Sequence, residues 1–153
     1  MRKLRPTTGD SGKKVQMDDK ELTGKIIAAA IAVHRDLGPG FLESIYEEAL
    51  CVELDLLKIP YERQNPIAII YRAKIVGEHR LDLLVAHTVV VELKAIKALE
   101  NIHFATVRSY MKATRSESGL LLNFASMPLT IKRVGRESGN QENKADNQEL
   151  RNS

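Results

Sequence analysis

Three charged residues stand in stretches that are otherwise apolar enough to form buried strands. Asp82 interrupts the run 81–85, and Glu92 and Lys94 fall at the end of the run 89–94. A carboxylate is costly to bury unless a cation or a metal ion compensates it. Side chains alternate along a strand, so Glu92 and Lys94 share one face. If the two runs form a hairpin, Asp82 can face the same side, and two carboxylates and one ammonium group then converge.

Two chemical interpretations follow from this convergence. Hard oxygen ligands suit Mg²⁺, which proteins hold through one or two carboxylates together with waters and phosphate oxygens. Such an ion polarises a phosphodiester and activates water, and a lysine can orient that water or stabilise developing charge. Alternatively, Lys94 forms a buried ion pair with Asp82 or Glu92, and the role is structural. The spacing of the residues leaves both interpretations open.

Two helices are predicted before these strands. Asp18 and Glu21 have capping-box spacing, an apolar stripe follows at helical spacing, and Gly38-Pro39-Gly40 ends this first helix. A second helix is predicted over residues 42–57. Its expected apolar positions are Leu42, Ile45, Tyr46, Ala49, Leu50 and Leu54, with the acids Glu47 and Glu48 mainly off this stripe.

The pattern then changes to strands. Residues 67–71 are β-rich, Val76-Gly77-Glu78 predicts a turn, and apolar runs follow over 80–86 and 88–95. A third helix is predicted over 100–113, a buried strand over 119–124 and a short edge strand over 129–134. This order predicts an α/β fold with a mixed sheet flanked by helices.

Composition limits the remaining possibilities. The 153 residues suit one domain, predicted over 17–135. No apolar run approaches the ~18 residues of a membrane span, and no secretory signal is recognisable, so we expect no membrane association and a cytoplasmic location. The single Cys51 excludes an internal disulfide and argues against a thiolate zinc site. The four histidines lack zinc-ligand spacing.

The net charge of +3 is unevenly distributed. Residues 1–16 have five basic residues and one acid, and residues 136–153 have three basic and four acidic residues. Both segments are polar, and we expect them to be disordered. Residues 17–55 have three basic and nine acidic residues, whereas residues 56–135 have twelve and six. The net +6 of the second part favours an anionic partner such as nucleic acid.

The combination of motifs resembles a known family. Asp82 followed by Glu92-Leu93-Lys94 resembles the D…(D/E)-x-K signature of the PD-(D/E)XK nuclease superfamily, although Leu81 replaces the proline of that name. Residues 40–46 read G-x-x-E-x-x-Y, the string that names the prokaryotic GxxExxY proteins within it. The resemblance continues through segments 77–85, 91–95, 110–114 and 119–124.

The resemblance implies an αβββαβ core and a nuclease dependent on Mg²⁺ or Mn²⁺. Its substrate would be nucleic acid, DNA in preference to RNA. Metal ligands would be Asp82, Glu92 and the main-chain carbonyl of Leu93. Lys94 would be catalytic, and Glu43 would complete the acidic cluster. Tyr46, His103 and Tyr110 are candidates for supporting roles, and for Tyr46 a packed aromatic with a satisfied hydroxyl is the other interpretation.

One departure supports a second functional hypothesis. Related exonuclease-like members carry Q-x-x-x-Y in the third helix, whereas this chain has Thr106 at the position of the glutamine, with Tyr110 matching. The shorter Thr106 cannot replace an amide that reaches toward the metal. The alternative is therefore a non-catalytic nucleic-acid- or protein-binding module on a nuclease-derived scaffold.

Overall fold

A five-stranded sheet with helices on both faces forms the fold of this protein. The structure is a computed structural model, and it describes residues 17–136. The elements in chain order are α1 (Asp19–Leu37), α2 (Glu43–Leu56), β1 (Tyr61–Tyr71), β2 (Lys74–Val85), β3 (Val89–Lys94), α3 (Asn101–Thr114), β4 (Ser118–Asn123) and β5 (Thr130–Gly135). This order confirms the predicted α/β class and the αβββαβ core.

The sheet is mixed, as predicted. Its strands lie in sequence order from β1 to β5, and every neighbouring pair is antiparallel except β3 and β4. Those two strands are parallel because α3 carries the chain from the end of β3 back to the start of β4. As the sequence indicates, β5 is an edge strand, and β1 forms the other edge.

The two helices before the sheet begin and end for local reasons. The Asp18 side chain accepts a hydrogen bond of 2.7 Å from the Glu21 amide and caps α1, as its spacing predicts. Gly38 and Gly40 follow with φ of +69° and +110°, a region that side chains with a Cβ rarely adopt. The predicted apolar stripe of α2 needs correction: Leu42 is 73% exposed, whereas Glu47 is buried.

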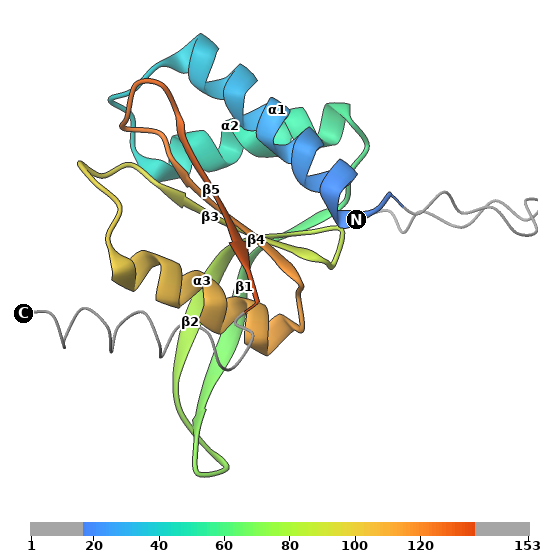
Figure 1. Ribbon diagram of the computed structural model, residues 1–153, viewed down its shortest axis with the longest axis vertical. Coiled ribbons are helices and arrows are strands. Elements are labelled where there is room, and N and C mark those ends of the chain that lie inside the picture. Colours follow the sequence, from blue (N-terminus) through green and yellow to red (C-terminus); the bar gives the residue numbers. More distant parts are fainter. Residues whose placement is uncertain (1–16, 137–153) are drawn as a thin grey trace, which may run out of the picture.

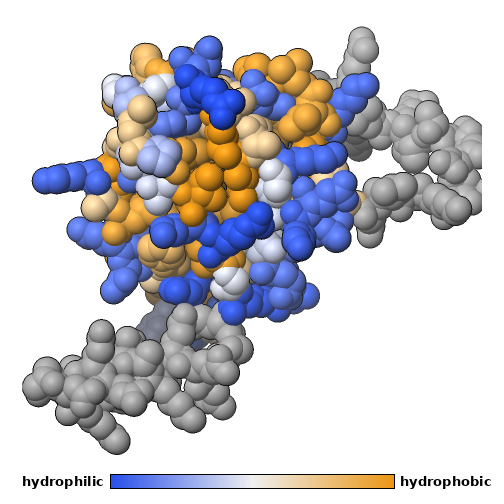
Figure 2. Space-filling model, turned by 45° about the horizontal axis from the view of Figure 1, so that its top comes forward, coloured by the Kyte–Doolittle hydropathy of each residue, from blue (hydrophilic) through white to orange (hydrophobic). Residues whose placement is uncertain are grey.

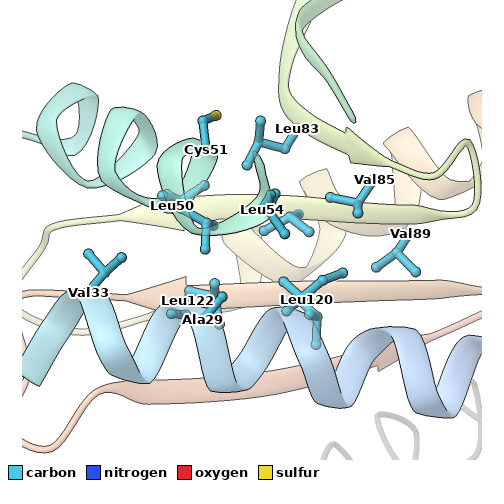
Figure 3. Close-up of a cluster of buried hydrophobic side chains, with 14 of the residues drawn as sticks. Ala29, Val33, Leu50, Cys51, Leu54, Leu83, Val85, Val89, Leu120 and Leu122 are labelled. Atoms are coloured by element: carbon cyan, nitrogen blue, oxygen red, sulfur yellow. The ribbon is translucent and has the colours of Figure 1, made fainter. Parts of the chain in front are cut away.

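Two apolar clusters lie on opposite faces of the sheet. The larger is between the sheet and helices α1 and α2, and Figure 3 shows its side chains directed toward one another. Its β3 members are Val89, Val91 and Leu93, and they alternate with Val90, which packs in the smaller cluster beneath α3. In that second layer Gly119 allows close approach, because a Cβ there would lie 2.8 Å from side-chain atoms of Val107 and Met111.

The β1–β2 hairpin is longer than the sequence indicates. The predicted turn at 76–78 is wrong: the strands remain paired as far as Tyr71 and Lys74, and the chain reverses at Arg72-Ala73. Both turn residues have positive φ, which is typical of a type I′ hairpin turn. Gly77 instead lies where the register shifts and leaves Val76 as an extra residue.

Figure 1 shows the outer part of this hairpin extending away from the helices and the rest of the sheet. Figure 2, in which the top of that view is turned forward, shows a central hydrophobic area bordered by hydrophilic residues. No helix within residues 17–136 is both long and apolar enough to cross a bilayer. The extensions expected at 1–16 and 136–153 lie outside the described residues, apart from Arg136, which pairs with Glu117.

Candidate functional site

The predicted acidic residues meet where β2 separates from β3. The two strands pair at Leu83, Leu84 and Val85, and the next register position would place Asp82 opposite Glu92. At that position, hydrogen bonds from backbone amides to side-chain carboxylates replace the backbone hydrogen bonds between the strands. The Asp82 amide donates to Glu92 Oε1 at 3.1 Å, and the Leu93 amide donates to Asp82 Oδ2 at 3.0 Å. Each carboxylate at the split is therefore held by a backbone amide of the other strand.

The regular alternation of β2 also breaks at Asp82. Leu83 and Val85 pack toward α1 and α2, and Leu84 packs toward α3. Regular alternation would send Leu81 to the α1–α2 side, but it packs in the α3 cluster. On the neighbouring strand, Gln64 has φ of +52° at the register position opposite Asp82. The hairpin thus exchanges its two faces at the row that contains the candidate site.

An open cleft of about 520 Å³ lies beside Asp82 on the α2 side. Its lining residues are Phe41, Leu42, Glu43, Ser44, Glu47, Gln64, Asp82, Leu93 and Ala95. Glu43 begins α2, and its Oε1 accepts a 3.3 Å hydrogen bond from the Ala95 amide just after β3. The structure therefore brings Glu43 and Asp82 to one cleft, as the resemblance implies. Glu92 and Lys94 do not line it.

The G-x-x-E-x-x-Y string has a physical explanation here. Gly40 supplies a positive φ in the loop before α2, and Glu43 is directed into the cleft. Tyr46 does not reach the carboxylates. Its buried hydroxyl donates to the Gly38 carbonyl at 2.6 Å and accepts from the Phe41 amide at 3.2 Å. Tyr46 is the packed aromatic with a satisfied hydroxyl, and it holds the loop that positions Glu43.

Burial and repulsion act together on the two central acids. Glu92 is 5% exposed, and its burial together with the nearby Asp82 carboxylate raises its pKa to about 8. The pKa of Asp82 is also raised, by burial first and then by the charges of Glu47 and Glu43. Lys94 Nζ lies 3.9 Å from Glu92 Oε2, and its charge lowers the pKa of Glu92. This ion pair offsets only part of the effect of burial and of Asp82, because the pKa of Glu92 remains raised.

The donor set fits a divalent cation. The two carboxylates supply hard oxygen atoms, and a cation would relieve the repulsion that raises both pKa values. Asp82 and Glu92 are the residues that would hold it, with Glu43 across the cleft. Within residues 17–136, however, no three acidic, histidine or cysteine side chains lie close enough together to hold an ion as they stand. The role of the Leu93 carbonyl as a metal ligand stays a prediction. The amide of the same residue donates a hydrogen bond to Asp82.

The two candidates on α3 differ in position. Burial, followed by the charges of Glu92 and Asp82, raises the pKa of Tyr110 to about 12, and its hydroxyl donates to the Arg80 carbonyl. His103 lies at the helix N-terminus, where its Nδ1 accepts from the Glu100 amide at 2.9 Å. Thr106 donates to the Ile102 carbonyl within its own helix. The structure thus brings Tyr110 near the acids and gives His103 a capping contact.

Sequence reasoning missed a polar network that supports the cleft. The buried Glu47 accepts from Arg63 at 2.7 Å through one oxygen and from Gln64 at 2.7 Å through the other. Gln64 also donates to Asp82 Oδ1 at 3.3 Å. Arg63 therefore neutralises an acid that faces Asp82, and Gln64 links the two carboxylates. No sequence signal points to Gln64. Glu47 could have been noticed because it directly follows Tyr46, the last residue of the G-x-x-E-x-x-Y string.

A second missed residue holds the loop after β3. Asn123 is 2% exposed, and its side chain bonds both backbone groups of Ile96: Oδ1 accepts from the amide at 3.2 Å and Nδ2 donates to the carbonyl at 2.9 Å. This clasp fixes the chain beside Ala95, whose amide holds Glu43. An asparagine within the apolar run 119–124 is a signal that sequence analysis can detect.

Comparison with known proteins identifies the class. The model of the PD-(D/E)XK nuclease superfamily matches residues 20–134, so the chain belongs to that superfamily. The match includes Glu43, Asp82, Glu92 and Lys94 within its span.

A solved structure, the crystal structure of SSO0001, is similar at 18% sequence identity with a TM-score of 0.48; the alignment covers 88% of this chain and 67% of that one. A search of curated proteins gave no match.

Proposed function

We propose that this protein is a divalent-metal-dependent nuclease that hydrolyses phosphodiester bonds in DNA. The observation that carries the proposal is the meeting of Asp82 and Glu92 at the split between β2 and β3, with Lys94 two residues further and Glu43 across the cleft. A buried acid whose pKa is raised by burial and by a neighbouring carboxylate, as for Glu92 beside Asp82, is characteristic of functional sites. Within the superfamily, residues 40–46 support assignment to the GxxExxY group.

In this proposal each residue has a distinct part. Asp82 and Glu92 hold Mg²⁺ or Mn²⁺, and Glu43 completes the acidic cluster. The bound ion would supply Lewis acidity toward the phosphodiester and lower the pKa of a water molecule. Lys94 stabilises negative charge that develops on the phosphate, and Gln64 orients Asp82 through its hydrogen bond. The DNA of a prokaryotic cell lies in the cytoplasm, and we place the protein there.

A cleavage assay tests the proposal. Purified protein is incubated with single-stranded, duplex and branched DNA, and with RNA, with Mg²⁺, Mn²⁺ or a chelator. We expect cleavage only with metal. It should disappear in Asp82→Ala, and in Lys94→Ala it should fall by roughly 10²–10³-fold, the usual cost of removing one group that stabilises developing charge in the transition state. Lys97→Ala is the matched control, because it removes an exposed lysine three residues away.

Two results would contradict the proposal. The first is intact substrate under all conditions with protein that melts cooperatively. The second is cleavage that survives in both Asp82→Ala and Lys94→Ala. Thermal melts of the same variants detect a purely structural role, since breaking a buried ion pair lowers stability by ~3–5 kcal/mol.

One observation favours a second function. The Thr106 hydroxyl is engaged at 2.9 Å within its own helix and offers nothing to the acidic residues. A binding module that has lost catalysis would bind DNA with unchanged affinity after Asp82→Ala and Lys94→Ala, and would cleave none of the substrates. The same protein preparations measured for binding and for cleavage distinguish the two functions.

A further inference from the structure

The outer part of the β1–β2 hairpin extends away from the core of the protein (Figure 1). Residues 66–80, called the hairpin arm here, remain paired strand to strand up to the turn at Arg72-Ala73. Every residue from 74 to 80 is exposed. A two-stranded hairpin is at best marginally stable by itself in water. The hairpin arm keeps its shape because its strands continue into the buried part of the sheet, and its side chains remain available to a partner.

Its side chains combine two properties. The large apolar residues Ile70, Tyr71, Ile75 and Val76 are 61–73% exposed. The arm also contains three basic residues, Arg72, Lys74 and Arg80, against one acid, Glu78, which gives a net charge of +2. At the tip, the Arg72 guanidinium lies 5.6 Å from the centre of the Tyr71 ring. The register places Ile70 opposite Ile75 and Tyr71 opposite Lys74, so the tip presents exposed apolar side chains together with cations on its two faces. Exposed large apolar groups gathered in this way are typical of a binding surface.

The arm begins at the candidate site. Asp82 lies two residues beyond Arg80, and β2 pairs with β3 only from Leu83 onward, so the hairpin arm leaves the sheet where the acids meet. Its base is fixed on α3: Tyr110 donates to the Arg80 carbonyl, and the His79 ring meets the Tyr110 ring edge to face at 6.2 Å. The hairpin arm therefore begins within two residues of Asp82, an acid that lines the cleft.

We propose that the hairpin arm binds in the major groove of duplex DNA, next to the phosphodiester held at the acidic cleft. The position of that phosphodiester rests on the proposed function, but binding by the arm does not require catalysis. A two-stranded β-ribbon fits the major groove, where apolar side chains can contact thymine methyl groups. Arg72, Lys74 and Arg80 match the charge of the phosphates. The same cations would repel a second copy of the arm.

The length of the arm gives the proposal a measurable scale. Eight residue steps lead from Lys74 to Asp82, which at ~3.3 Å per residue corresponds to about 26 Å. At ~3.4 Å of axial rise per base pair, this length sets an upper limit of about 8 base pairs, because a ribbon in the groove follows a path inclined to the DNA axis. The footprint of the protein on duplex DNA should therefore extend to one side of the position of the cleft, by no more than about 8 base pairs.

Fluorescence anisotropy with a labelled 20-base-pair duplex tests the arm in the full chain, with chelator present so that no cleavage occurs. We expect the double variant Arg72→Ala/Lys74→Ala to bind roughly 10- to 100-fold more weakly, with the slope of log K against log salt reduced by about 1–2. The matched control is Lys20→Ala/Lys25→Ala on α1, which removes the same charge from exposed positions and should change binding little.

Several outcomes would overturn the inference. Equal weakening by both double variants would mean that only net charge matters. If the arm variant lost the same affinity for single-stranded as for duplex DNA, the arm would not bind in the major groove. Conversion of a dimer to a monomer by the arm variant, with unchanged DNA affinity in sedimentation and anisotropy, would make a second copy the partner.

The two proposals fail separately. Absence of cleavage together with arm-dependent duplex binding contradicts only the nuclease. Cleavage with no effect of the arm variant on binding or on the hydroxyl-radical footprint contradicts only the arm.

Discussion

The two halves of the β1–β2 hairpin have the same backbone pairing but opposite surroundings. In the inner half, Leu83 and Val85 are fully buried beneath α1 and α2. In the hairpin arm, Ile75 is 73% exposed. The boundary is the row of Gln64 and Asp82, where the hairpin also exchanges its faces. Hydrogen bonding is common to both halves, so burial of apolar surface is what makes the inner half stabilise the fold.

The difference between the two halves also separates the consequences of mutation. A substitution in the inner half should change stability, whereas one in the hairpin arm should change binding. The acidic site lies between the two halves, so a substitution there should change both stability and binding. Three predictions test this separation.

The largest expected difference is between two aliphatic residues on β2. Leu83→Ala should lower the free energy of unfolding by about 2–5 kcal/mol, because it leaves a cavity in the core. Ile75→Ala should change it by less than about 0.5 kcal/mol, since the side chain is exposed. Urea unfolding followed by circular dichroism measures both. Similar losses in the two variants would show that the hairpin arm packs against something in the folded protein.

A second comparison uses two arginines at the two ends of the hairpin. Arg63→Ala removes the cation that pairs with the buried Glu47, and stability should fall by about 1–3 kcal/mol. Arg72→Ala should leave unfolding nearly unchanged and weaken binding of duplex DNA. Unfolding curves and anisotropy on the same two proteins test this reversal. Weaker binding in Arg63→Ala beyond that in Arg72→Ala would place the main DNA contact at the cleft.

The smallest expected effect concerns the acidic site without metal. Glu92 has a folded pKa of about 8, above the value of 4.5 for a free glutamate. Its protonation therefore stabilises the folded state fully below about pH 4.5, and this contribution is lost as pH rises through about 8. Glu92→Gln should abolish that loss. In chelator, the variant should melt several degrees higher than the original protein at pH 9 and nearly equally at pH 5; a difference independent of pH would contradict the shifted pKa.

Sequence reasoning anticipated most of the architecture for identifiable reasons. The caps and glycines of α1, and the apolar runs of β3 and β4, are local signals that packing did not override. The predicted turn failed because Gly77 is the more typical turn residue, yet the reversal occurs at Arg72-Ala73, whose types do not favour positive φ. The glycine accommodates a register shift within the strand instead.

Long-range contacts limited the prediction of the site. Asp82, Glu92 and Lys94 stood out because charges are rare in apolar strands, and the family resemblance added Glu43. Glu47 was missed because its burial depends on Arg63, sixteen residues later in the sequence. Gln64 was missed because its backbone conformation and its contact with Asp82 arise only when β1 pairs with β2.

The position of β1 at the edge of the sheet has a consequence for solubility. A long edge strand rich in isoleucine is a template for self-association, and residues 66–71 contain three isoleucines and one tyrosine. Pro66 has no amide to donate, the register shift at Val76 twists the ribbon, and the cations at the tip repel neighbouring copies. Of these three barriers only the last is electrostatic, so it alone weakens as salt is added.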